Sequence, residues 1–355
     1  MTNDTTTTYP LTIGLDLGTN TTQCAIYGPN NKRIQEHKRA TTRAKLTELF
    51  QKHPGARIVM EASTPTRWIY KLATELGHEV IIATPRNIPV ITKSIRKSDV
   101  RDARLLAELG QVQPSLLSPI TLRGDNFQSV RTILFAREQL VGTRTRLVTF
   151  VRSQVKAIGE RLAPCSTKSF AHKVRESMPD SLKQPLESIL QMIQMLSDRI
   201  DGYDADIDRL SKKDFPETSV LRQVHGVGPL VALAFVATIG DPKRFSKSRS
   251  VGAYMGLVPK LSQSGESNPG LSISKYGDSF MRSALVSSAT RIMGPKGADS
   301  DLREYGLRIA GRGGIKSKAK ARIAVARKLA VLLHALLATG EVYEPMRHTG
   351  EPATV

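Results

Sequence analysis

Four acidic residues in the first third of the chain stand where they could share a metal ion. They are Asp16, Glu61, Asp99 and Asp102. The first two lie at the end of, or directly after, short apolar runs with the composition of β-strands, Leu11–Leu17 and Arg57–Met60. The other two are spaced i, i+3, which places both on one face of a helix. Because strand ends and a helix start can converge in a compact α/β domain, the four carboxylates can meet.

The chemistry of such a cluster is metal-assisted phosphoryl transfer. Carboxylates gathered in a basic protein repel one another unless cations neutralise them, and hard oxygen ligands at an open site suit Mg²⁺ or Mn²⁺. Two such ions could activate a nucleophile and stabilise the leaving oxygen. A structural interpretation stays open, in which Asp99 caps its helix while Asp102 and Glu61 are solvated surface acids.

The segment around Asp16 also allows another function. Residues Gly14–Thr22 resemble the first phosphate loop of the actin, heat-shock ATPase and sugar-kinase superfamily. A kinase or ATPase is not favoured, because no convincing second phosphate loop follows and the chain is too positively charged. The last third of the chain also does not duplicate the first.

An α/β domain must position these acids, and residues 11 to about 110 show the required alternation of short strands and helical stretches. The predicted strands are Leu11–Leu17, Gln23–Tyr27, Arg57–Met60 and Glu79–Ala83. The first two form a hairpin across the turn Gly18-Thr19-Asn20. The predicted helices cover Thr42–Lys52, Pro65–Leu76 and the stretch that follows Ser98 through Leu109.

The charge balance indicates the partner. The chain has 52 Lys and Arg against 32 Asp and Glu, a formal net charge of +20, which is typical of a protein that binds a polyanion such as nucleic acid. We find no apolar run of about 18 residues and no signal-peptide start, so we expect a cytoplasmic protein with no membrane partner. Cys24 and Cys165 are too few and too far apart to predict a disulfide framework or a zinc site.

Residues 125 to about 213 predict long helices with seven-residue periodicity. A first stretch repeats apolar residues every seven positions at Leu134, Val141, Val148 and Val155. A second stretch steps by three and four through Leu186, Ile189, Ile193, Leu196, Ile200, Tyr203, Ile207 and Leu210. This is the a/d seam of a coiled coil. The seam could join two helices of one chain or the protomers of a homo-oligomer, and heptads alone do not separate the two.

The last third of the chain offers two candidate phosphate contacts. Gly226 and Gly228 form a Gly-x-Gly turn whose backbone N–H groups could approach a phosphate, although the motif taken alone favours a tight turn between two helices. A run of cations interleaved with Gly, Ser and Ala follows later. It contains Arg312, Lys316, Lys318, Lys320, Arg322 and Arg327. In so basic a chain we expect these side chains to contact phosphate rather than only water.

An ordered set of motifs resembles a known family. The motifs are Gly226–Pro229, Ile239–Asp241, Arg244–Phe245, Tyr254–Pro259, Ser264–Gly265 and Ser274–Gly277, together with Asp99–Ala103 and Ala324–Leu329. The set is similar to the DEDD-type transposases of bacterial insertion sequences, recombinases that are guided by a bridge RNA. The resemblance covers roughly residues 11 to 345, and its specificity comes from the order of the motifs.

The resemblance implies a role for each candidate residue. Asp16, Glu61, Asp99 and Asp102 would be the metal-binding acids of a domain similar to RuvC-type resolvases, and Ser264 would be a nucleophile. This sequence has Gln263 where many members have a small residue, which leaves Ser262 as an alternative nucleophile. The resemblance also implies double-stranded DNA from the element ends and the target, and a structured guide RNA, as partners.

We therefore predict three regions. They are an α/β RNase H-like (RuvC-type) domain over residues 10–115, long coiled-coil helices over 120–215, and a mainly α-helical transposase domain over 216–345. The predicted function is strand exchange by a dimer or tetramer in the cytoplasm, associated with the nucleoid when acting. Two alternatives stay open: a structure-selective nuclease that uses metal-activated water, and a non-catalytic scaffold that binds nucleic acid.

Overall fold

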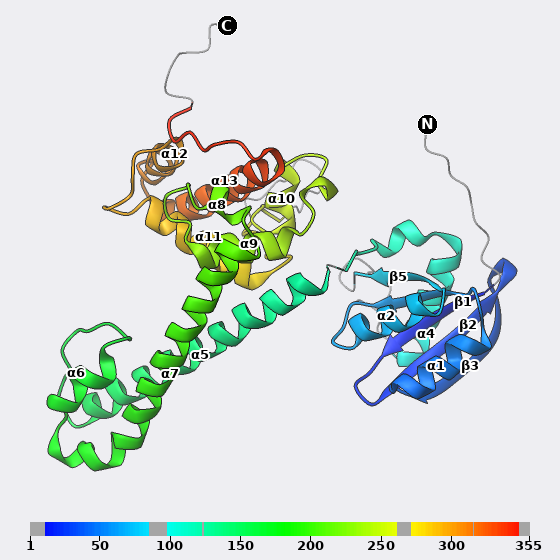
Figure 1. Cartoon of the computed structure of the whole chain (residues 1–355), viewed down its shortest axis with the longest axis horizontal. Helices are drawn as coiled ribbons and strands as arrows, with labels where there is room; N and C mark the ends of the chain where they lie inside the picture. Colours follow the sequence, from blue (N-terminus) through cyan, green and yellow to red (C-terminus); the bar gives the residue numbers. More distant parts are fainter. Residues whose placement is uncertain (1–10, 85–97, 123, 261–270, 315, 348–355) are drawn as a thin grey trace, which may run out of the picture. The chain divides into compact units, whose positions relative to one another are not determined.

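The computed structural model describes residues 11–84, 98–122, 124–260, 271–314 and 316–347. The chain divides into two compact units, Met1–Leu122 and Arg123–Val355 (Figure 1). The first unit holds a sheet and its covering helices. The second unit holds both the helices predicted for residues 120–215 and the helical region predicted for 216–345.

The first unit is built on a mixed five-stranded sheet with the order β3-β2-β1-β4-β5. The strands are β1 (Thr12–Leu17), β2 (Thr21–Gly28), β3 (Lys32–Ala40), β4 (Arg57–Glu61) and β5 (Glu79–Ala83). β1, β2 and β3 pair antiparallel, whereas β1, β4 and β5 pair parallel. The four predicted strands and their hairpin are confirmed.

The edge strand β3 is one that the sequence did not predict. Its sequence KRIQEHKRA is mostly charged or polar, and its one large apolar side chain, Ile34, is 58% exposed. Hydrogen bonds to β2 form this strand rather than a buried apolar face. Charged side chains on an edge strand also discourage pairing with other sheets.

Helices cover both faces of this sheet (Figure 1). They are α1 (Arg43–Lys52), α2 (Thr66–Glu75) and α4 (Asp99–Val112). α1 and α2 pack on one face through Leu15, Met60 and other buried apolar residues. α4 lies on the opposite face, where a methyl group built on Gly14 would collide with the backbone of Ala103. The helix backbone therefore rests directly on β1, which only glycine at position 14 permits.

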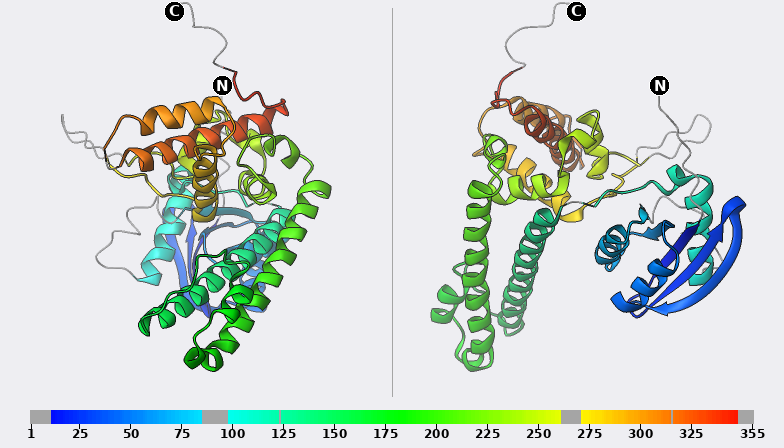
Figure 2. Two further views of the ribbon diagram at one scale, coloured as in Figure 1. Left: turned by 90° about the vertical axis from the view of Figure 1, so that its left-hand side faces the viewer. Right: turned by 45° about the vertical axis from the view of Figure 1, so that its right-hand side comes forward.

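The second unit contains a long two-helix arm. α5 (Asp125–Ala157) and α7 (Asp180–Lys213) run alongside each other (Figure 2), and the short α6 (Phe170–Glu176) packs on α7. Apolar seam residues such as Ile193 and Ile200 are buried within the chain. The seam also buries Arg144, whose Nη1 donates a hydrogen bond to Ser197 Oγ at 3.1 Å. In the described residues the predicted seam is thus satisfied inside one chain.

The rest of the second unit is a helical bundle. Its elements are α8 (Thr218–Leu221), α9 (Pro229–Ile239), α10 (Arg249–Tyr254), α11 (Ser279–Ile292), α12 (Asp301–Ala310) and α13 (Ser317–Thr339). α9 is buried on nearly all sides, and α13 packs against α10, α11 and α12. Within the described ranges, no helix has the length and apolarity needed to cross a membrane.

Candidate active site and nucleic-acid interface

Asp16 and Glu61 lie at the same level on neighbouring parallel strands. The register pairs Leu15 with Met60, and each acid is the next residue of its strand. Gly14 contacts α4, and Val59 belongs to the apolar cluster under that helix. Because side chains alternate along a strand, Asp16 and Glu61, two residues further on, also face α4.

Asp102 joins them from the first turn of α4. Its side chain is buried, with 5% of the residue exposed, and it immediately precedes Ala103, which contacts β1 at Gly14. The Oδ1 atom of Asp102 and the Oε1 atom of Glu61 are both shielded from solvent. The alternative that Asp102 is a solvated surface acid is therefore wrong.

Asp99 differs from Asp102 although both lie in the first helical turn. Asp99 is exposed, whereas Asp102 is buried. The N-cap of α4 is Ser98, whose hydroxyl accepts a hydrogen bond from the backbone N of Arg101 at 3.4 Å. The alternative that Asp99 caps the helix is wrong, and Asp99 is instead an exposed acid in the first turn of α4.

The donor set on the α4 side of the sheet fits a hard divalent cation. Asp16, Glu61 and Asp102 would supply oxygen ligands, and Glu61 and Asp102 each have one carboxylate oxygen shielded from solvent. In the described residues these side chains are not drawn into a cluster of three that could already hold an ion. The fold thus brings the three acids to one end of the sheet, and the metal site itself stays a prediction.

Ser264 and the alternative Ser262 lie outside the described residues. The structure describes the segments on either side of residues 261–270, and hydrogen bonds join these two segments. Pro259 forms an isolated antiparallel bridge with Ile273, and the backbone N of Lys260 donates to Ser272 O at 2.9 Å.

Further contacts fasten these two segments at their base. Arg282 of α11 donates from Nη1 to the carbonyl oxygens of Met255 and Tyr276, both at 3.2 Å. Gly256 and Gly277 have positive φ angles of 68° and 84°, and a methyl group on either would collide with the opposite segment. The chain thus enters and leaves residues 261–270 from a rigid base.

The Gly-x-Gly turn has a packing role. Gly226 has φ 85°, and a methyl group there would lie 3.2 Å from Ser288 O of α11. Gly228 is the N-cap residue of α9 and Pro229 its first helical residue. A phosphate contact at this turn stays a prediction.

The predicted basic residues line the turn between α12 and α13 and the first half of α13. They are Arg312, Lys316, Lys318, Lys320 and Arg322, and each is exposed. In the part of the chain that the structure describes, none forms an ion pair with a carboxylate. Their charges are therefore available to a polyanion. Arg249, which no sequence signal singled out, is brought to α13 by α10.

Burial makes Cys24 chemically inert. It raises the pKa of the Cys24 thiol to about 12, more than the nearby Arg39 lowers it. The thiolate is therefore scarce at neutral pH. This agrees with the absence of any predicted role for this residue.

Comparison with known proteins decides the family. The model described as "Transposase IS116/IS110/IS902 family" matches residues 218–304, and a DEDD-type IS110 model described as "Transposase" matches residues 13–159. The chain belongs to this family of transposases. The resemblance predicted from the ordered motifs is confirmed.

Relatives match this transposase over most of its length. A "Probable family 20 transposase" of Pseudomonas aeruginosa is 27% identical over 345 residues, which cover 94% of this chain and 98% of the relative. A transposase for insertion sequence element IS1111A of Coxiella burnetii is 26% identical and covers 81% and 79% of the two chains. A "Pilin gene-inverting protein" of Moraxella bovis is 26% identical and covers 82% and 83%.

Proposed function

We propose that this transposase cleaves and exchanges DNA strands between a mobile element and its target. The observation that carries the proposal is the gathering of Asp16, Glu61 and Asp102 on the α4 side of one sheet. The net charge of +20 supports a polyanionic substrate. The names of the relatives, two transposases and a gene-inverting protein, also support it.

In this proposal the first unit is an RNase H-like domain of the RuvC type. Its two acids on adjacent strand ends and a third on a covering helix support the assignment. Asp16, Glu61, Asp99 and Asp102 would hold Mg²⁺ or Mn²⁺. Bound there, the ions would polarise the scissile phosphate and stabilise the leaving oxygen. The shielded carboxylate oxygens of Glu61 and Asp102 would keep their ligand positions without competition from bulk water.

The proposed nucleophile is Ser264. Its Oγ forms a bond to a DNA phosphorus, the bond from phosphorus to the sugar oxygen breaks, and the serine proton passes overall to that sugar oxygen. A serine–phosphate ester conserves the energy of the broken bond, so the strand can be rejoined without ATP. The rigid base formed by Gly256, Gly277 and Arg282 supports this role, because a nucleophile needs a fixed origin.

The proposed partners follow from the charge distribution. Arg312, Lys316, Lys318, Lys320 and Arg322 would contact phosphates of the element-end DNA, the target DNA or a structured guide RNA. Exchange between two duplexes requires several active sites, so we propose a dimer or tetramer that acts at the nucleoid in the cytoplasm. Because the seam is internal, exposed apolar residues of the arm, such as Phe150 and Met195, are the better candidates for joining protomers.

Covalent capture tests the proposal. Wild-type protein with Mg²⁺ and cognate nucleic acids should form a protease-sensitive DNA adduct that mass spectrometry assigns to Ser264. Ser264→Ala should bind DNA normally and form neither adduct nor recombinant. An adduct on Ser262 would move the nucleophile by two residues, and full recombination by both alanine variants would eliminate the serine mechanism.

A second candidate is a structure-selective endonuclease. The acids alone favour it, because metal-activated water could cleave branched DNA without any serine. This enzyme would release cleaved DNA with no protein attached, so the same capture experiment separates the two.

A further inference from the structure

Two hollows lie in line along one face of α13. The first, of about 620 Å³, is lined by Arg312, Lys316 and Lys320 among others. The second, of about 680 Å³, is lined by Ala324, Arg327, Lys328, Val331 and Ala335 of the same helix. Residues spaced by three, four and seven share a helix face, so both hollows lie on one stripe. We call this stripe and its two hollows the α13 groove.

The chain around α13 carries only positive charges, and the acids Asp301 and Glu344 reach the second hollow from outside this segment. From Tyr305 to Gly340 the sequence has eight Lys and Arg and no Asp or Glu. Within the described residues no carboxylate pairs with any of the eight. Lys316 and Lys328 are twelve residues apart, so the cationic stripe is about 18 Å long. It is long enough to follow several successive phosphates.

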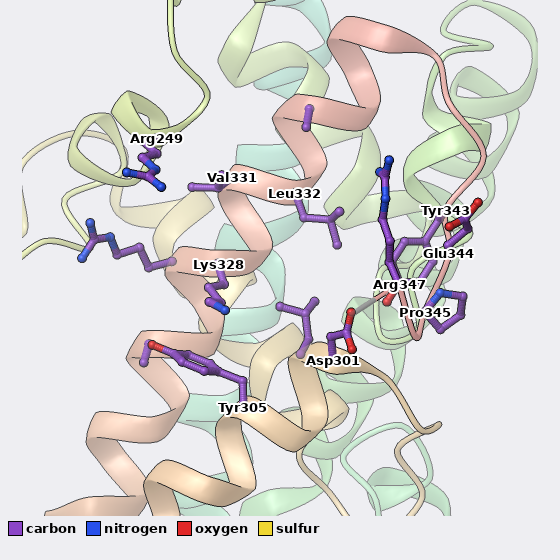
Figure 3. Close-up of a pocket in the computed structure, with 14 residues that line it drawn as sticks. Arg249, Asp301, Tyr305, Lys328, Val331, Leu332, Tyr343, Glu344, Pro345 and Arg347 are labelled. Atoms are coloured by element: carbon purple, nitrogen blue, oxygen red, sulfur yellow. The ribbon is translucent and has the colours of Figure 1, made fainter. Parts of the chain in front are cut away.

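Tertiary contacts hold the cations at the groove. The ammonium of Lys328 lies 4.0 Å above the ring of Tyr305, a cation–π contact. The stem of Arg327 passes over Gly252 of α10, where a methyl group would lie 3.0 Å from Arg327 Cγ. Figure 3 shows Arg249 at one side of the second hollow and Asp301, Tyr343, Glu344 and Arg347 at the other, with Lys328 and Val331 between. The basic edge is therefore the α10 side.

We propose that the α13 groove binds an unpaired DNA strand. The cations would contact its phosphates, and the apolar floor of Ala324, Val331 and Ala335 would face its sugars and bases. A duplex keeps its bases inside the stack, so only an unpaired strand can place its bases on this floor. The floor residues Ala324, Val331 and Ala335 carry no polar side-chain atom, and burial of an unsatisfied 2′-hydroxyl against them is unfavourable, so DNA is favoured over RNA. This inference deepens the proposed function, because strand exchange exposes unpaired DNA.

The arm offers a control that removes the same charge. Lys320 and Arg327, seven residues apart, line the groove. Arg146 and Lys156 of α5 are equally exposed, line neither hollow and have no proposed binding role. The double variants Lys320→Gln/Arg327→Gln and Arg146→Gln/Lys156→Gln therefore remove two positive charges each, the first pair from the groove and the second from the arm.

Fluorescence anisotropy with labelled oligothymidylate over a salt series tests the proposal. Lys320→Gln/Arg327→Gln should bind on the order of tenfold more weakly. The slope of log K against log salt should fall by about 1.4, because each lost single-strand phosphate contact removes about 0.7. Arg146→Gln/Lys156→Gln should bind within about twofold of wild type and keep its slope. Equal melting temperatures would show that both variants fold.

Three results would overturn the inference. The first is that the two double variants weaken oligothymidylate binding by the same factor. The second is that wild type binds oligouridylate more tightly than oligothymidylate. The third is that the groove variant loses as much affinity for a DNA duplex as for oligothymidylate. The proposed chemistry is tested separately, because Asp102→Asn should bind oligothymidylate normally while losing cleavage. If the groove does not bind the unpaired strand, the wild-type protein should still cleave DNA. If the wild-type protein does not cleave DNA, it should still bind oligothymidylate.

Discussion

The two units place their functional side chains by different physical means. In the first unit, acids from β1, β4 and α4 come to one end of the sheet because strands pair and a helix backbone rests on Gly14. In the second, cations line the exposed face of α13, where the helical repeat alone places them on one stripe. An acid site built from three elements tolerates few changes in its packing, whereas a cationic stripe loses binding one charge at a time.

Substitution of the acids gives the largest expected effect. Asp16→Asn, Glu61→Gln, Asp99→Asn and Asp102→Asn should each reduce Mg²⁺-dependent strand cleavage by on the order of a hundredfold or more, because each removes a charge that a metal-bound transition state needs. Gel assays of DNA cleavage measure this, with circular dichroism to check folding. Asp180→Asn on α7, an exposed acid, is the control and should cleave normally. Near-normal cleavage by two or more of the four variants would remove the assignment.

A charged side chain placed in the buried seam of the arm should have the next largest effect, which is a loss of folding stability. Ile193 is fully buried, whereas Gln191, two residues earlier, is exposed. Ile193→Asp should lower the free energy of unfolding by about 3–5 kcal/mol, and Gln191→Asp should change it by less than about 0.5 kcal/mol. Urea denaturation measures both. An Ile193→Asp protein of wild-type stability and smaller mass in light scattering would show instead that the seam joins protomers.

Replacement of a glycine by alanine should have opposite effects on the stability of the two units. Gly14→Ala should destabilise the first unit by about 1–3 kcal/mol, because the new Cβ would collide with Ala103 O and lie 2.6 Å from Ala107 N. Gly142 of α5 has open space around it, so Gly142→Ala should stabilise its helix by about 0.5–1 kcal/mol. Thermal unfolding followed by circular dichroism measures both changes. A neutral Gly14→Ala would mean that α4 does not rest on β1.

The smallest effect concerns pH and the first unit. Burial lowers the pKa of His37 from 6.5, and the nearby cations Arg39 and Lys52 and the ring of His53 lower it further. The unfolded chain therefore takes up the proton first, so stability falls as pH drops below about 6.5 and is unaffected well above it. His37→Gln should flatten this dependence in urea titrations at neutral and mildly acidic pH. His172→Gln on α6, an exposed histidine, should leave it unchanged, and equal slopes for both variants would contradict the prediction.

Local pattern made much of the fold predictable. Four strands follow from short apolar runs, and the starts of α1 and α4 follow from Thr42 and Ser98, whose hydroxyls cap the first turns. These features depend on residues close together in the chain. β3 escaped prediction because its stability comes from hydrogen bonds to β2, to which its charged sequence gives no clue.

Some features of the candidate site could likewise be predicted from the sequence, and others could not. The sequence by itself determined the acid types, their places at strand ends and on one helix turn, the seven-residue seam and the run of cations, since each is a matter of residue type and spacing. Only the tertiary structure decided that Asp102 is buried while Asp99 is exposed, that the seam closes within one chain, and that α10 brings Arg249 to α13. Periodicity is set by the local backbone, whereas burial and the choice of partner depend on contacts between residues far apart in sequence.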